Sequence, residues 1–140
     1  MMLNPLIQFY ESLTPQSIAQ FSQHYSEDAY FKDPFNEVHN LPAIQRIFTH
    51  MFTQVDSPRF MVLEHFEKEK QIMLIWEFHF RGRQPGMRQD QVIRGVSHLK
   101  ANAEGKICFH RDYWDASEEL YMKIPGFGLL MRALRRTLSA

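Results

Sequence analysis

The sequence predicts an α+β, cone-shaped fold in which N-terminal helices pack on a curved antiparallel sheet, with a further helix at the C-terminus. Apolar residues recur at helical spacing over the first 55 residues, whereas residues 59–115 contain four runs rich in Val, Ile and aromatic side chains. Helices that precede the strands, rather than alternate with them, are typical of α+β proteins. The 140 residues are expected to form a single domain, residues 1–140.

Three helices are expected before the strands. The first begins at Asn4 and Pro5 and the second at Thr14 and Pro15, because each pair joins an N-cap residue to a proline at the first helical position. One face of the second helix comprises Ile18, Phe21 and Tyr25. The third helix follows Asn40, and its apolar stripe comprises Leu41, Ile44, Ile47, Phe48, Met51, Phe52 and Val55.

A C-terminal helix is expected from about Phe127 to Leu138, where apolar residues recur at helical spacing and arginines occupy the other side. Such a helix could cap the mouth of the cone, add to a dimer contact or lie on an anionic membrane surface. We expect the cap, with Gly126 and Gly128 as its hinge.

The four strand-like runs span residues 59–67, 71–82, 91–101 and 106–115, and short turns join two pairs of them. Side chains two residues apart lie on the same face of a strand. The sets expected to face the interior are Leu74, Trp76 and Phe78 on one strand and His110, Asp112 and Trp114 on the last. The outer face is expected to carry Met73, Ile75, Ile107, Phe109 and Tyr113, and this apolar face predicts a homodimer packed sheet to sheet.

The composition excludes several classes of protein. Sixteen basic residues balance sixteen acidic ones, so the chain lacks the basic character of a general nucleic-acid binder. A single cysteine, Cys108, cannot form an intrachain disulfide or a Cys-pair zinc site. No run approaches the roughly 20 apolar residues of a membrane helix, and the N-terminus lacks the features of a signal peptide. We therefore expect a cytoplasmic protein without integral membrane association.

The stretch YFKDPF places Asp33 among aromatic residues. If this carboxylate faces the interior, the rings remove water from it and make it a stronger base. It could equally end a strand by binding backbone amides in a turn. His110 and Asp112 could relay protons, fix a water molecule or form a structural pair. No metal site or cofactor is expected, because these two side chains supply only two of the three or four ligands that a metal needs.

The run YESLTPQSIAQFSQHYSEDAYFKDPFNEVHNLPAIQRIF resembles the N-terminal half of ketosteroid isomerases, which belong to the nuclear transport factor 2-like and SnoaL-like superfamily. The resemblance implies that Tyr10 donates a hydrogen bond to the substrate oxyanion and that Asp33 is the general base. Ser97 occupies the position of a second, protonated aspartic acid. A hydroxyl is a weaker acid, so the resemblance implies weaker stabilisation of an enolate than in those isomerases.

The run HRDYWD resembles the end of limonene epoxide hydrolases, in which the counterpart of Asp112 is a catalytic aspartate. Those enzymes also place Arg and Asp two residues apart on an earlier strand, where this chain has Trp76 and Phe78. That difference argues against epoxide hydrolysis.

These observations predict a SnoaL-like domain that binds a small hydrophobic molecule in the cone. It would act as an isomerase, cyclase or dehydratase with Asp33, Tyr10, Asp112 and His110 as catalytic residues. The expected substrate-binding residues are Ser97, Trp76, Phe78, Trp114 and Leu74. The alternative is a non-catalytic module for ligand binding or dimerisation, because one fold hosts many functions.

Overall fold

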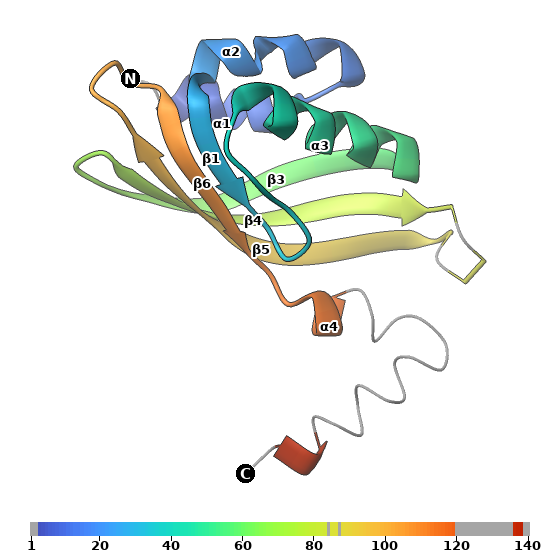
Figure 1. Cartoon of the computed structure of the whole chain (residues 1–140). Helices are drawn as coiled ribbons and strands as arrows, with labels where there is room; N and C mark the ends of the chain where they lie inside the picture. Colours follow the sequence, from blue (N-terminus) through green and yellow to red (C-terminus); the bar gives the residue numbers. More distant parts are fainter. Residues whose placement is uncertain (1–2, 84, 87, 120–135, 139–140) are drawn as a thin grey trace.

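The chain folds into N-terminal helices packed on one curved sheet, which confirms the α+β class (Figure 1). The computed structural model describes residues 3–83, 85–86, 88–119 and 136–138. The helices are α1 (Leu3–Glu11), the 3-10 helix η1 (Pro15–Gln20), α2 (Phe21–His24), α3 (Leu41–Gln54) and α4 (Ala116–Glu119). The strands are β1 (Tyr25–Lys32), β2 (Glu37–Val38), β3 (Val55–Lys68), β4 (Gln71–Gly82), β5 (Asp90–Ala101) and β6 (Ile107–Tyr113).

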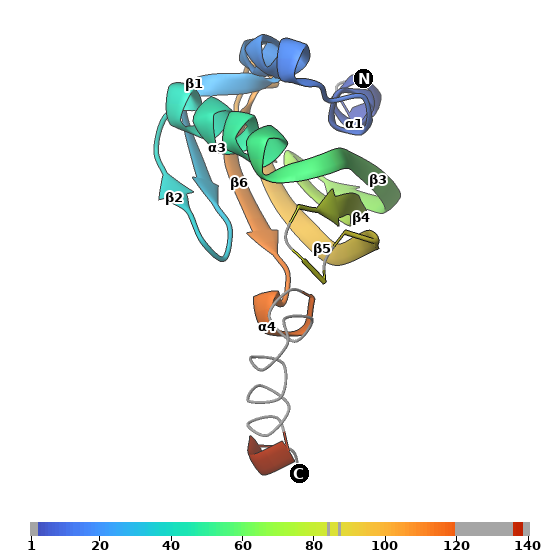
Figure 2. The ribbon, with the colours of Figure 1, turned by 90° about the vertical axis from the view of Figure 1, so that its right-hand side faces the viewer.

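The sheet has the strand order β2-β1-β6-β5-β4-β3. Strands β3 to β6 form the antiparallel meander expected from the sequence. The sheet is nevertheless mixed rather than wholly antiparallel, because β1 pairs parallel with β6. Figure 2 shows α3 lying across the concave side, with β1 and β2 to one side of it and β3 to β5 to the other.

The second helix ends earlier than predicted. It stops at His24, and Tyr25 has extended backbone angles, φ −117° and ψ 146°. Tyr25 starts β1, where it pairs with Ile107 and is buried. The helical spacing of Tyr25 from Phe21 was therefore misleading, because pairing with a strand distant in sequence determines its conformation.

The inner face of the sheet carries the alternating residues that strand periodicity predicted. Leu74, Trp76 and Phe80 of β4 are buried, as is His110 of β6. The three β4 residues pack with Phe21 and other apolar side chains of the helices in a single core cluster.

The prediction for Ile107 was wrong. It was assigned to the outer face, but its side chain is fully buried. The register between β5 and β6 shifts between Lys100 and Ala101, and that between β1 and β6 shifts between Tyr25 and Tyr30. These irregularities break the alternation at the start of β6, so Ile107 and His110 both face the core although they are three positions apart.

The predicted helix from Phe127 to Leu138 lies outside the described residues except for residues 136–138, which are helical and exposed. The hinge proposed at Gly126 and Gly128 also lies outside them. A short helix that the sequence did not predict, α4, follows β6.

Asn40 begins α3, the helix that covers the concave side. Its side-chain oxygen accepts a hydrogen bond from the Ala43 backbone N–H at 2.8 Å, as an N-cap does.

Replacing Asn40 with Ala should lower the free energy of unfolding by about 1 kcal/mol, because this N–H loses its partner. Urea denaturation measures the change. Asn4→Ala is the control, since Asn4 is exposed within α1 and is not the cap predicted from the sequence. Equal effects of the two substitutions would contradict the capping role.

Candidate functional site

A cavity of about 260 Å³ lies between α3 and the inner face of the sheet. Its wall is mainly aromatic and includes Phe31, Phe48, Phe60, Trp76, Phe78, Phe80 and Trp114. The Phe60 and Phe78 rings stack with centroids 4.6 Å apart, and Phe60 meets Trp76 edge to face at 6.0 Å. The carboxylates in this wall are Asp33 and Asp112. The cavity thus combines an apolar surface with a few polar groups, as small-molecule sites do.

A second cavity of about 30 Å³ lies deeper in the fold. It shares Phe48, Phe60, Trp76 and Asp112 with the larger cavity, and its other residues are Tyr10, Val62, Leu74, Ser97 and His110. A space of this size can hold a water molecule or a single polar group of a ligand.

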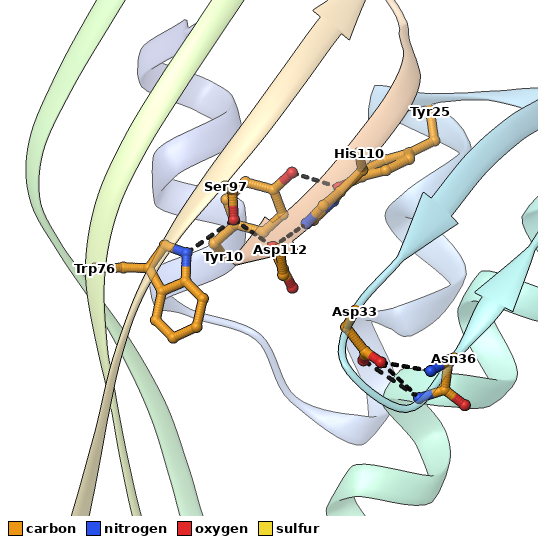
Figure 3. Close-up of polar contacts among 8 residues, drawn as sticks. All are labelled: Tyr10, Tyr25, Asp33, Asn36, Trp76, Ser97, His110 and Asp112. Atoms are coloured by element: carbon orange, nitrogen blue, oxygen red, sulfur yellow. Dashed lines mark hydrogen bonds and ion pairs between the residues drawn. The ribbon is translucent and has the colours of Figure 1, made fainter. Parts of the chain in front are cut away.

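Six side chains form a continuous hydrogen-bonded chain beside these cavities, which we call the relay: Trp76, Ser97, Asp112, His110, Tyr25 and Tyr10 (Figure 3). The Trp76 indole N–H donates to Ser97 Oγ at 2.8 Å, and Ser97 Oγ donates to Asp112 Oδ1 at 2.5 Å. His110 Nε2 lies 2.6 Å from the same carboxylate oxygen.

The other end of the relay runs through two tyrosines. His110 Nδ1 lies 2.6 Å from the Tyr25 hydroxyl, which is hydrogen-bonded to the hydroxyl of Tyr10. Ser97 and His110 are only 5% and 3% exposed, so hydrogen bonding within the relay compensates for their removal from water.

Asp112 is the relay member best placed to react with a ligand. Its Oδ1 accepts from Ser97 and contacts His110 Nε2, whereas Oδ2 has no hydrogen-bond partner among the described residues. The side chain is 16% exposed and lines both cavities. A carboxylate oxygen that is free and faces an aromatic cavity can accept a proton from a ligand.

Asp33 has the turn geometry that the sequence left open as an alternative. Its Oδ1 accepts from the backbone N–H groups of Phe35 and Asn36 at 2.8 and 2.7 Å. The Asn36 side-chain amide donates to Oδ1 at 3.1 Å and Oδ2 at 3.2 Å. Figure 3 shows Asp33 turned toward Asn36 and apart from the relay. Asp33 lines the large cavity, but its carboxylate already stabilises the loop.

Burial raises the pKa of both tyrosine hydroxyls in the relay. For Tyr10 the largest cause is removal from water, and the negative charge of Asp112 adds to it. For Tyr25 removal from water is again the largest cause, followed by its interaction with Tyr10. Both hydroxyls therefore keep their protons at neutral pH and act as hydrogen-bonding groups rather than as anions.

Trp76 lies flat against β5 because the residue opposite it is glycine. The two strands pair Trp76 with Gly95, and a Cβ built on Gly95 would lie 2.5 Å from Cζ2 of the indole and closer still to Cη2. The absence of this one carbon lets the indole reach Ser97 and leaves space in front of it for the cavities.

The structure groups most of the residues that the sequence predicted for the site. Asp33, Asp112, Trp76, Phe78 and Trp114 line the large cavity. The small cavity is lined by Tyr10, Leu74, Ser97 and His110, together with Asp112 and Trp76.

Sequence reasoning missed Tyr25 and Gly95 as parts of the site. Tyr25 had been assigned to a helix. The strand pattern around Trp76 could not identify Gly95, because the register between two strands is a tertiary property.

Among the described residues, no group of three or more His, Cys, Asp and Glu side chains is placed to hold a metal ion. Within the same residues, no helix is long and apolar enough to cross a membrane.

A family model described as the SnoaL-like domain matches residues 6–110. The chain therefore belongs to the SnoaL-like domain family. No curated protein matches it in sequence. The matched residues extend from α1 into β6 and include most of the relay, up to His110.

Solved structures share this fold at low sequence identity. One is a putative SnoaL-like polyketide cyclase from Shewanella putrefaciens CN-32, with a TM-score of 0.70, 20% identity and coverage of 86% of this chain and 96% of that one. Another is a hypothetical protein with a ketosteroid isomerase-like fold from Catenulispora acidiphila DSM 44928, in complex with trimethylamine, with a TM-score of 0.71, 11% identity and coverage of 85% and 88%.

A third structure is an NTF2-like protein of unknown function from Burkholderia pseudomallei K96243, with a TM-score of 0.70, 12% identity and coverage of 99% and 98%. At these identities the three structures establish the fold alone. The match to the SnoaL-like domain is what confirms the superfamily that the sequence resemblance indicated.

Replacing Gly95 with Ala should push the Trp76 indole into the cavities and separate it from Ser97. We expect weaker binding of an apolar fluorescent dye and a loss of about 1–3 kcal/mol in the free energy of unfolding. Ser97→Ala is the matched control, because it removes the same hydrogen bond without adding bulk. If Gly95→Ala binds the dye as the wild type does, the indole does not set the cavity volume.

Proposed function

We propose that this SnoaL-like domain binds a small apolar carbonyl compound in the 260 Å³ cavity and abstracts a proton next to the carbonyl, with Asp112 as the general base. The observation that carries the proposal is that Asp112 lines both cavities while its Oδ2 has no hydrogen-bond partner among the described residues. The reaction class is that of an isomerase, cyclase or dehydratase.

The aromatic wall supports an apolar ligand. Phe60, Phe78 and Trp76 present ring surface to the cavity, and a flat conjugated ligand gains from contact with such rings. The volume lies just below the range of about 300–1,000 Å³ that is usual for small-molecule sites, which favours a compact ligand.

The proposed step balances as a simple proton transfer. The C–H bond next to the carbonyl breaks, its proton passes to Asp112 Oδ2, and its electron pair moves to the carbonyl oxygen to give an enolate. Return of the proton to another carbon isomerises the ligand, whereas attack of the enolate carbon on a second carbonyl closes a ring. The small cavity beside Tyr10 suits the oxyanion, since a preorganised hydroxyl can stabilise developing charge.

Asp112 is the better candidate for the base than Asp33, which the family resemblance implied. Asp33 accepts hydrogen bonds at both carboxylate oxygens, from the Phe35 and Asn36 backbone N–H groups at Oδ1 and from the Asn36 side-chain amide at Oδ1 and Oδ2. Asp112 accepts only at Oδ1 among the described residues, so its Oδ2 is available to take a proton. In our proposal Asp33 is a second carboxylate in the wall, which holds the loop and interacts with polar parts of the ligand.

The fold neighbours are consistent with this class of function. The Shewanella protein is described as a putative polyketide cyclase, and polyketides contain carbonyl groups. The Catenulispora protein holds trimethylamine, a small molecule with apolar methyl groups. A domain that binds its ligand without reaction is the second candidate, favoured by the aromatic character of the wall.

Replacing Asp112 with Asn tests the proposal. With 2-acetonaphthone as the probe, we expect the wild type to catalyse exchange of the methyl hydrogens for deuterium in heavy water, followed by NMR. Asp112→Asn keeps the shape of the side chain but lowers its basicity, so the rate should fall about 10²–10⁴-fold.

Asp33→Asn is the matched comparison and should change the exchange rate far less. Loss of exchange in Asp33→Asn with exchange retained in Asp112→Asn would return the role of base to Asp33. A wild type that binds the ketone without exchange would support the binding module instead.

We further propose that the outer face of the sheet pairs with a second copy of the chain. Its exposed apolar side chains include Leu63, Phe66, Met73 and Tyr113. Phe66 and Met73 are direct neighbours across β3 and β4, so the apolar surface is continuous there. Water-exposed apolar area of this kind usually packs against a partner.

Replacing both Phe66 and Met73 with Glu should convert a dimer into a monomer at micromolar concentration, as measured by light scattering. The reason is that two charges would be buried on each side of the interface. Ser12→Glu on the helical side is the control and should leave the mass unchanged. A monomeric wild type would contradict the proposal.

A further inference from the structure

The relay meets the cavities at Asp112 and again at Tyr10, its last member. Asp112 lines both cavities, and Tyr10 lines the small one. Between them lie His110 and Tyr25, so the His110 imidazole and the hydroxyls of Tyr25 and Tyr10 form an unbroken row. Such a row can transmit a change of protonation from one end to the other, because each member gives and receives one hydrogen bond.

The hydrogen-bond directions at the Asp112 end are fixed by chemistry. An indole N–H only donates, so Ser97 accepts from Trp76 and gives its own proton to Asp112. An ionised carboxylate only accepts, so His110 Nε2 must carry a proton toward it. The neutral and the protonated forms of His110 therefore differ only in whether Nδ1 carries a proton.

A neutral His110 orders the tyrosines in one direction. Nδ1 then has no proton and accepts from the Tyr25 hydroxyl, whose oxygen in turn accepts from Tyr10. The hydroxyl proton of Tyr10 is then donated to Tyr25, within the relay. Toward the small cavity Tyr10 can offer only its oxygen, as an acceptor.

A protonated His110 reverses this order. Nδ1–H donates to Tyr25, the Tyr25 hydroxyl must then donate to Tyr10, and the Tyr10 proton is released from the relay. Tyr10 lines the small cavity, and no other partner for its hydroxyl is found among the described residues. Its proton is therefore available to an acceptor in that cavity.

We propose that the protonation of His110, transmitted through Tyr25, decides whether Tyr10 donates or accepts a hydrogen bond in the small cavity. The site would then take a carbonyl or oxyanion when His110 is protonated and a hydroxyl when His110 is neutral. Tyr25 and His110 are positioning residues in this scheme, because they act through Tyr10. The choice of ligand rests on the proposed function, whereas the coupling within the relay does not.

The surroundings of His110 leave few other groups that could control it. Among the described residues, the titratable side chains in contact with it are Asp112 on its own strand, Tyr25 on β1 and Tyr10 on α1. Phe31 of β1 packs against the imidazole with centroids 4.7 Å apart, and β5 pairs it with Leu99. Asp33 shares the large cavity with Asp112 and is the next nearest carboxylate in that wall.

The high pKa of both tyrosines fits such a coupling. Burial raises the pKa of Tyr10 and of Tyr25, so both remain protonated while His110 gains or loses a proton. A change at the imidazole therefore reorients hydroxyl protons without creating a phenolate.

The coupling is tested without any ligand. In protein labelled with 15N-histidine and with 13C at the tyrosine Cζ, the Tyr10 Cζ shift should follow the same pH titration as the His110 nitrogens. Tyr25→Phe should abolish this common titration, because it removes the hydroxyl between them. Tyr30→Phe is the matched control on the same strand, since that hydroxyl binds Glu37 on the outer face.

Any of three results would overturn the coupling. The Tyr10 signal could fail to change as His110 titrates in the wild type, or the common titration could persist in Tyr25→Phe. The third is that His110 does not titrate while the protein is folded. Each is read from the same spectra.

The ligand preference is tested with the ketone 2-acetonaphthone and the matched alcohol 1-(2-naphthyl)ethanol. Above the His110 titration, the affinity for the ketone should fall up to tenfold per pH unit, and its binding should take up one proton. The alcohol should show no such loss. Calorimetry in buffers of different ionisation enthalpy counts the protons.

In Tyr25→Phe both probes should bind with the same pH dependence. Equal pH dependence of the two probes in the wild type would overturn the ligand preference. Failure of both probes to bind would count against the proposed function and the preference drawn from it, while the NMR titration still decides the coupling.

Discussion

The parallel pairing of β1 with β6 is the constraint on which the candidate site depends. It brings Tyr25 beside His110, 85 positions later in the chain, and thereby connects α1 to the last strand through Tyr10. A buried hydroxyl or imidazole is costly unless it is hydrogen-bonded, so the relay favours this register over its neighbours. Apolar packing alone would not discriminate so sharply, because a shifted β1 could still bury aromatic rings.

The geometry of the site depends on how Asp112 uses its two carboxylate oxygens. Asp112 uses Oδ1 for Ser97 and His110, and its Oδ2 has no hydrogen-bond partner among the described residues. The side chain lines the same cavity as Trp76 and Phe78. The two partners hold the carboxylate in one orientation, and its side chain is only 16% exposed. Electrostatic interactions are stronger in such surroundings than in water, which suits a group that must exchange a proton with a ligand.

Several features were predictable because they depend on local spacing. The alternation of Leu74, Trp76 and Phe78 gave the inner face of β4, and the same rule placed His110 with Asp112 on β6. The rule failed for residue 107, because irregular pairing at the start of β6 shifts which side chains face inward. The rule also could not show that Asp33 and Asp112 have different roles, since both are carboxylates close to aromatic residues in the sequence.

The sequence by itself determined the α+β class, the antiparallel meander and the set of polar residues available to the site, because these follow from periodicity and residue type. Only the tertiary structure decided that Tyr25 joins the relay and that Gly95 makes room for Trp76. It also decided that Asp33 stabilises a turn, while Asp112 Oδ2 has no hydrogen-bond partner among the described residues. Each of these depends on contacts between segments far apart in the chain. The register that brings such segments together is set by the packing of the whole core, which no short stretch of sequence encodes.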